Sequence, residues 1–304
     1  MKLRLLIVIT GWCIHLNLFS QEISEVSLFE QNQTYYNPGS IGNQEVLAAN
    51  FFYRAQWIGF SDGTPSTQVF CAHAPLRDPS VAMGVTLEHD ALGSINYTGF
   101  YVHYAYRLTL GGNKISFGLK GGITSLSQDR ISLRDNPDPL FDEDNQTSYV
   151  PNFGVGILFY GRQYWAGISV PRLFGYKHYS SGYYGMDPDI ANYEYVIMGG
   201  GRFPIGSTLS IDPSAMVIFS TRYDFRLTLM GTAVYKKAYK AGIGFRLGEA
   251  VFLAIGYQLN RQFSLGYSYD FNIGETYTYA SGSHEINIGY KFGYKVNASN
   301  PRGF

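Results

Sequence analysis

Residues 251–294 read VFLAIGYQLNRQFSLGYSYDFNIGETYTYASGSHEINIGYKFGY, and three segments of this stretch carry a large apolar side chain at every second position. In the first segment, Val251, Leu253, Ile255, Tyr257 and Leu259 alternate mostly with Ala, Gly and Gln. A period of two places alternate side chains on opposite faces of a β-strand. Each segment therefore predicts a strand with one apolar face and one small or polar face.

Such strands are typical of an outer-membrane barrel, because its outside meets lipid and its inside is polar or tightly filled. A soluble β-sandwich also alternates, but its exposed face usually carries Lys and Glu rather than Gly and Ser. The chain contains 35 Gly, 26 Tyr and 21 Phe but only 15% charged residues, which favours the membrane barrel. Arg246 would cost about 2 to 4 kcal/mol at mid-depth on the lipid face, so its side of the strand is predicted to face the lumen.

The same pattern predicts fourteen strands in all, an even number as in single-chain bacterial barrels. They span residues 46–58, 66–76, 81–89, 96–110, 114–127, 150–160, 163–171, 193–204, 208–219, 225–236, 239–247, 251–259, 263–271 and 285–294. If the first strand runs outward, six tight connections fall on the periplasmic side. All the long connections then fall on the outer side, where only 248–250 is short. The predicted fold is an all-β, antiparallel, up-and-down transmembrane β-barrel of about 14 strands.

The two ends of the chain have different expected roles. Residues 1–20 are predicted to be a secretory signal peptide, with Lys2 and Arg4 ahead of an apolar core. Residues 21–45 are polar and rich in turn formers, and they are predicted to be an N-terminal periplasmic segment. The barrel is predicted over 46–294, with a periplasmic tail over 295–304. Lys and Arg together number 23, as do Asp and Glu, so nothing indicates nucleic-acid binding.

Motifs for catalysis or cofactor binding are sparse. His89 and Asp90, at a strand end, are the pair that a hydrolase at the outer rim could use, but no Gly-x-Ser-x-Gly motif accompanies them. The acidic residues of 135–144 could ligate Ca²⁺, yet they lack the spacing and glycine of a known calcium loop, and the sequence leaves calcium open. The Gly-rich run 199–201 lies within a predicted strand and precedes no helix that could hold a phosphate. The chain is therefore predicted not to be an enzyme and to carry no cofactor or metal.

A series of short motifs resembles the PorP/SprF family of outer-membrane proteins of the Bacteroidetes type IX secretion system. They occur in the family's order over nearly the whole chain after the signal peptide. They are YNPG (36–39), RAQWIG (54–59), GTPST (63–67), APL (74–76), DALG (90–93), YAYR (104–107), DPLF (138–141), PNFGVG (151–156), GISVP (167–171) and GSHE (282–285).

The resemblance implies a non-enzymatic outer-membrane barrel of the secretion and gliding machinery. Its expected role is to help export or anchor an adhesin-like surface protein through that protein's C-terminal domain, together with periplasmic machinery components. The partner-binding residues expected on this basis are Asn37, Pro38, Arg54, Trp57, Gly59, Pro65, Asp138, Pro139 and Phe141. The residues alone leave two structural roles open: Arg54 as an inner-wall charge paired with an acid, and Trp57 as an aromatic residue at the membrane interface. An alternative is an outer-membrane channel for a small or hydrophobic solute, since fourteen strands can enclose a lumen.

Overall fold

The computed structural model describes residues 24–59, 63–128, 147–178, 184–187, 189–220, 225–274 and 281–293. Its main sheet contains these strands: β1 (Ala48–Ala55), β2 (Ser66–Pro75), β3 (Val81–Leu92), β4 (Ile95–Leu110), β5 (Asn113–Gln128), β6 (Thr147–Tyr160), β7 (Tyr164–Val170), β10 (Tyr195–Gly201), β11 (Phe203–Ile205), β12 (Leu209–Phe219), β13 (Arg226–Tyr235), β14 (Tyr239–Arg246), β15 (Ala250–Gln258), β16 (Phe263–Asn272) and β17 (Ser283–Lys291).

These strands close into a barrel. Each strand pairs antiparallel with its neighbours, β1 pairs with β17, and β10 pairs with both β7 and β12. β11 follows β10 after one residue and continues along the same partner, β12, so the two form a single wall strand. The wall therefore has fourteen strands over the described residues, which confirms the fold predicted from the alternation.

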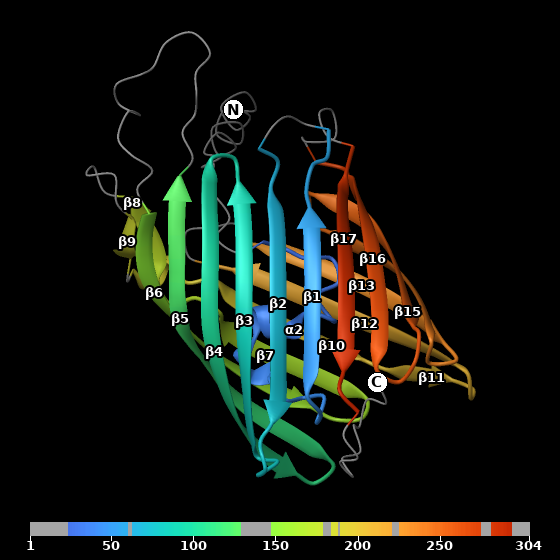
Figure 1. Ribbon diagram of the computed structural model, residues 1–304. Coiled ribbons are helices and arrows are strands. Elements are labelled where there is room, and N and C mark those ends of the chain that lie inside the picture. The colour runs from blue at the N-terminus through green and yellow to red at the C-terminus, as the bar shows by residue number, and fades with distance from the viewer. Residues whose placement is uncertain are drawn as a thin grey trace, which may run out of the picture.

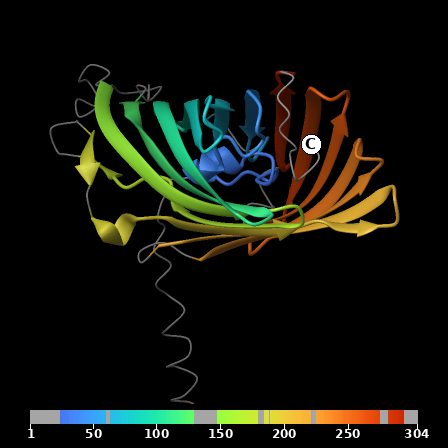
Figure 2. The same ribbon diagram turned by 90° about the horizontal axis from the view of Figure 1, so that it is seen from below.

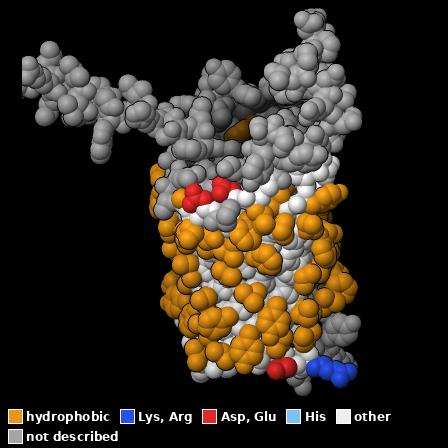
Figure 3. Space-filling model, turned by 90° about the vertical axis from the view of Figure 1, so that its left-hand side faces the viewer, with side chains coloured by type: hydrophobic (Ala, Val, Ile, Leu, Met, Phe, Trp, Pro, Cys, Tyr) orange, Lys and Arg blue, Asp and Glu red, His pale blue; other side chains and the backbone are white. Residues whose placement is uncertain are grey.

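The two faces of the wall have the predicted chemistry. Leu253 and Ile255 point outward and are 49% and 62% exposed, whereas Phe252, which precedes Leu253 in the same strand, points inward and is fully buried. Arg246 also points inward and is 1% exposed, as its cost on a lipid face requires. Figure 3 shows a broad band of hydrophobic side chains on the viewed face, with charged side chains near its two ends.

The two ends of the barrel differ in their connections. Tight turns join the strands at the end toward which β2 runs, and the long connections lie at the end toward which β1 runs (Figure 1). Two outer connections are short, 247–249 as predicted and also 93–94, where the sequence predicted a longer loop. Because short turns of outer-membrane barrels face the periplasm, we call the first end the inner end and the second the outer end. The inner turns are 76–80, 111–112, 161–163, 206–208, 236–238 and 259–262.

Part of the wall near the outer end is irregular. β7 pairs with β6 only over Val155–Tyr160, and farther out residues 171–174 lie along β6 instead, where Leu173 N donates to Phe153 O at 2.8 Å. A separate hairpin of β8 (Gly175–His178) and β9 (Tyr184–Asp187) and the 3₁₀ helix η3 (Ile190–Asn192) follow. The sequence predicted only an outer loop here.

Residues 24–45 lie inside the barrel, and we call them the lumen segment. They contain the short helix α2 (Gln33–Tyr36) and the 3₁₀ helix η1 (Pro38–Ser40), which Figure 2 shows enclosed by the wall. Most of their side chains are buried, including Val26, Phe29 and Ile41, each at 0% exposure. The sequence assigned 21–45 to the periplasmic side, whereas the structure places 24–45 in the lumen. The predicted signal peptide, 1–20, and the predicted tail, 295–304, lie outside the described residues.

Among the described residues, no helix has the length and apolar character needed to cross a membrane.

Candidate functional site

The lumen segment runs from the outer end to the inner end. Ser24 Oγ donates to Asp90 Oδ1 at 3.3 Å near the outer end of β3. Glu45, at the other end of the segment, forms an ion pair with Lys114 at the inner end of β5. The chain therefore crosses the lumen once before β1 begins, and its described N-terminal residue lies at the outer end.

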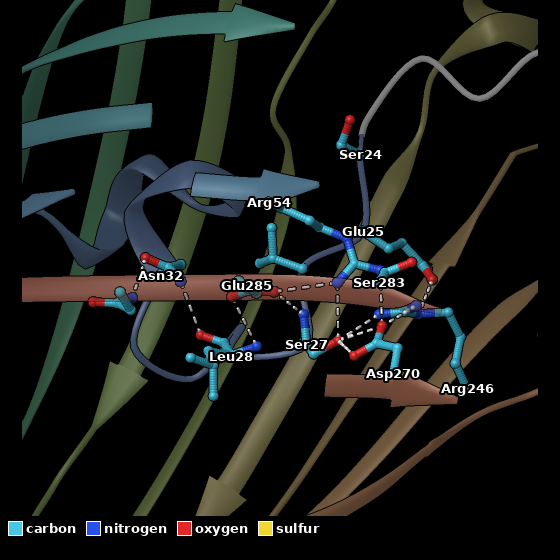
Figure 4. Close-up of polar contacts among 12 residues, drawn as sticks. Ser24, Glu25, Ser27, Leu28, Asn32, Arg54, Arg246, Asp270, Ser283 and Glu285 are labelled. Atoms are coloured by element: carbon cyan, nitrogen blue, oxygen red, sulfur yellow. Dashed lines mark hydrogen bonds and ion pairs between the residues drawn. The ribbon is translucent and has the colours of Figure 1, made fainter. Parts of the chain in front are cut away.

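A group of buried charges holds the outer half of the lumen segment, and we call Ser27, Arg54, Arg246, Asp270 and Glu285 the outer anchor (Figure 4). Ser27 Oγ donates to the Asp270 carboxylate at 2.7 Å, and Ser27 N donates to Glu285 Oε2 at 2.7 Å. Arg54 Nη2 lies 2.8 Å from Asp270 and its Nη1 lies 3.4 Å from Glu285. Arg246 Nη1 reaches the same Asp270 oxygen at 3.2 Å. Each buried charge thus has partners of the opposite sign, which is the condition for burial without a large penalty.

Glu25 extends this cluster toward the outer end. Its carboxylate lies 2.8 Å from Arg246 Nε and 3.9 Å from Arg226 Nε. Arg246 also pairs with Glu249 at 3.1 Å, so one guanidinium connects the lumen segment, β16 and the connection that precedes β15.

Asn37 fixes the middle of the lumen segment against β6 and β7. Its Nδ2 donates to Ile157 O at 3.0 Å, and its Oδ1 accepts from Gly39 N at 2.8 Å to cap η1. The wall opposite is built from glycine, since a Cβ at Gly118 would lie 2.2 Å from Gly39 N and one at Gly156 would lie 2.1 Å from Asn37 Oδ1. Gly118 is therefore required by the close approach of the lumen-segment backbone, and Gly156 by that of the Asn37 side chain.

The inner half of the lumen segment is held mainly by hydrogen bonds between its backbone and side chains of the wall. Arg107 Nη1 donates to Gly42 O at 2.5 Å, and Gly42 N donates to His73 Nδ1 at 3.1 Å. Gly42 has φ +75°, and a Cβ there would lie 2.4 Å from the Ala82 side chain. The segment is consequently fixed at its outer end, in its middle and at its inner end.

A second buried group fixes the irregular part of the wall. Arg172 enters the lumen and pairs with Glu88 at 2.9 Å and with Asp90 at 3.9 Å. Lys120 Nζ lies 4.2 Å from the centre of the Tyr101 ring, a cation–π distance. Since Asp90 also accepts from Ser24, the irregular wall and the lumen segment share one carboxylate.

The partner-binding residues predicted from the sequence fall into three groups. Asn37, Pro38 and Arg54 are buried and contact the protein itself. Trp57 (φ 53°) and Gly59 (φ 86°) lie together at the outer end of β1, and Pro65 lies in the same connection. The third group, Asp138, Pro139 and Phe141, lies outside the described residues. Partner binding by any of them stays a prediction.

Sequence reasoning did not single out Ser27, Asp270 or Glu285. Asp270 and Glu285 do occupy inward positions of strongly alternating strands, and a charge at such a position needs a partner in the lumen. Ser27 carries no comparable signal, because it lies in a segment without a period.

The geometry disfavours a hydrolase at His89 and Asp90. The two are adjacent on β3, so their side chains face opposite sides of the wall. His89 Nδ1 lies 2.9 Å from Thr98 Oγ1, whereas Asp90 faces Arg172 and Ser24 in the lumen. The acidic stretch 135–144 lies outside the described residues.

A closed fourteen-stranded barrel with an apolar belt and a filled lumen defines an outer-membrane β-barrel protein. The chain belongs to the family described as "Type IX secretion system membrane protein PorP/SprF", whose match covers residues 18–290. This confirms the resemblance seen in the motifs and the outer-membrane location. The family and the fold are those of a non-enzymatic outer-membrane protein.

Solved structures share the fold at low sequence identity. The Ralstonia pickettii toluene transporter TbuX matches with a TM-score of 0.53 at 8% identity, over 86% of this chain and 93% of that one. The CymD monoaromatic hydrocarbon channel matches with a TM-score of 0.52 at 10% identity, over 87% and 94% of the two chains. Comparison with curated proteins gives no match.

Proposed function

We propose that this protein is a non-enzymatic barrel of the type IX secretion and gliding machinery that helps export or anchor a partner surface protein through that protein's C-terminal domain. Membership of the PorP/SprF family supports the assignment of this protein to the type IX secretion machinery. The observation that carries the role is the filled lumen: residues 24–45 occupy it and are tied to the wall along their whole length. A barrel so filled is suited to presenting surfaces at its two ends.

The outer surface formed by Trp57, Gly59 and Pro65 is the part of the described chain that we infer contacts the surface protein. Trp57 is partly exposed, Ile58 beside it is 39% exposed, and both adjoin the connection before β17, where Ile58 N donates to Gly282 O at 2.9 Å. Asn37 and Arg54 would act indirectly, by fixing the lumen segment. Aromatic residues at a protein surface are frequent anchors of protein interfaces.

The test compares surface proteins in a strain that lacks the gene and in strains complemented with variants. We expect the deletion to reduce the surface-exposed amount of proteins with type IX C-terminal domains, measured by protease shaving and mass spectrometry. Trp57→Ala should lower display of the partner, whereas Tyr239→Ala, which removes an exposed aromatic at the inner end, should not. Unchanged display of these proteins in the deletion strain would overturn the proposal.

Transport of a small or hydrophobic solute is the competing function. It is not favoured by the described lumen, since the residues that would line a path instead contact the lumen segment. Purified wild-type protein in planar bilayers should show no steady conductance, and a steady solute-selective conductance would establish transport instead.

A further inference from the structure

The inner end of the barrel is strongly basic. Five exposed side chains on its turns are cationic, namely Arg77, Arg162, Lys236, Lys237 and Arg261, and we call them the basic rim. Among the described residues of these turns the exposed acid is Asp78 alone. The chain as a whole has equal numbers of basic and acidic residues, so this excess is local.

A cavity of about 150 Å³, lined mainly by polar residues, lies at the same end of the barrel as the basic rim. Residues at the inner ends of β1, β15 and β17 line it, and three cations, Arg202, Lys240 and Lys291, face one carboxylate, Glu30. Arg202 is paired with Asp212 at 2.6 Å. Lys291 makes no ion pair with any residue that the structure describes. The cavity therefore continues the positive charge of the rim into the barrel.

The turn that carries Lys236 and Lys237 has a strained backbone. Ala238 N donates to Tyr235 O at 3.1 Å, and the two central residues have φ of 51° and 55°. Left-handed backbone disfavours L-residues with a long side chain, and turns of this kind prefer Asn and Gly at these positions. Strain kept at an exposed position points to a role for the side chains that cause it. Here those side chains add two cations to the rim.

We propose that the basic rim and its cavity bind an acidic segment of a periplasmic protein. This deepens the proposed function and rests on it in one respect, that the barrel works with periplasmic parts of the secretion machine. Opposite charges on the two surfaces speed association and set the orientation of the complex.

A protein segment fits the arrangement better than lipid headgroups do. Anionic headgroups of the inner leaflet can reach the rim, but they are tethered outside the wall and cannot enter a cavity lined by lumen-facing residues. An extended acidic segment can place one carboxylate near Lys291 and others near Lys236 and Lys237. Dependence of binding on both places therefore distinguishes a peptide from a membrane surface.

The test uses the full chain without its signal peptide, in nanodiscs of zwitterionic lipid, and a fluorescent ten-residue oligo-glutamate peptide as the probe. Fluorescence anisotropy should show binding that weakens as salt rises. Lys236→Asn with Lys237→Gly should weaken it by about 2- to 25-fold, from about 0.2 to 1 kcal/mol for each exposed pair lost. Lys291→Gln should weaken peptide binding as well. Two control variants should not weaken it: the double variant Lys236→Arg with Lys237→Arg, which keeps both charges, and the single variant Asp78→Asn.

Several outcomes decide the matter. The Asn-Gly variant fits the turn, so its thermal midpoint should not fall, and weaker binding then reports lost charge rather than unfolding. Oligo-glutamate binding that is insensitive to both the rim and Lys291→Gln would overturn the proposal. So would rim-dependent binding to phosphatidylglycerol vesicles without any binding of oligo-glutamate. Lost peptide binding with normal surface display in cells would uphold the binding site and refute its part in export.

Discussion

Arg54→Met tests whether the outer anchor holds the lumen segment in place. Arg54 is fully buried, lies 2.8 Å from Asp270 and 3.4 Å from Glu285, and donates to Ser27 Oγ at 3.2 Å. Methionine keeps most of the side-chain volume but removes the charge. Glu285 would then keep only the backbone N–H groups of Ser27 and Leu28 among its described partners, and Asp270 would keep Arg246.

Removing one partner of a buried ion pair typically destabilises a protein by about 3–5 kcal/mol, because a buried charge is left uncompensated. With a urea dependence of about 1–3 kcal/mol per molar, the unfolding midpoint should fall by roughly 1 M or more. The assay is urea unfolding of the purified barrel in detergent, followed by its heat-modifiable migration on gels. Limited proteolysis should show cleavage within 24–45 at urea concentrations that leave the wild type intact.

Arg261→Met is the matched control, since Arg261 is exposed on an inner turn. It should change the free energy of unfolding by no more than about 0.5 kcal/mol, as surface substitutions usually do. Glu285→Gln in the Arg54→Met background should restore part of the loss, because it removes one of the carboxylates that Arg54 had balanced. If Arg54→Met were no more destabilising than Arg261→Met, the anchoring role of the cluster would be refuted.

Three further predictions follow from the wall and the lumen segment. Gly118→Ala should displace the lumen segment, because the new Cβ would meet Gly39 N and the Pro38 carbonyl carbon at 2.2 Å. The displacement should show as faster proteolysis within 24–45, and resistance equal to that of the wild type would contradict the prediction. Leu253→Arg should cost about 2 to 4 kcal/mol at mid-depth on the lipid face, seen as less folding into vesicles, and undiminished folding would refute the assigned face. Ser24→Cys should react with a membrane-impermeant maleimide on whole cells, whereas labelling only after outer-membrane permeabilisation would reverse the direction of the lumen segment.

The wall could be predicted from the sequence because lipid acts on every strand in the same way. A strand with alternating Leu253, Ile255 and Tyr257 needs no tertiary information to have its faces assigned, since charge is excluded from one face by solvation alone. Arg246 indicated which face of the alternating strands lines the lumen, and its burial in the structure agrees with that assignment. The even number of strands and the unequal connections then fixed the topology.

The lumen segment could not be predicted in this way. Its contacts involve single residues, such as Ser27 with Asp270 and Asn37 with a carbonyl of β6, and these are about 240 and 120 positions apart in the sequence. No period relates such pairs. The inward glycines Gly118 and Gly156 were the available signal, because a lumen face made of glycine leaves room either for solvent or for another backbone. Sequence alone does not separate those two cases.

The candidate site was predicted only in part for a related reason. Arg54 was named as a partner-binding residue or as an inner-wall charge paired with an acid, and the structure shows the pairing. Trp57 and Gly59 lie at the outer end, where a partner could reach them. The basic rim was not recognised, since its cations come from separate turns and are brought together only by closure of the barrel.

The position of the outer anchor links closure of the barrel to seating of the lumen segment. Arg54 in β1 and Glu285 in β17 are directly opposite residues of the strand pair that joins the two ends of the sheet. Ser27 donates to Glu285 and to Asp270 in β16, so the lumen segment contacts both last strands beside this seam. A barrel closed around an empty lumen would bury these carboxylates without the Ser27 N–H and hydroxyl. A seated segment without closure would lack Arg54 opposite Glu285. Each step therefore stabilises the other, and we expect the first strand, the last strands and the lumen segment to assemble as one cooperative unit.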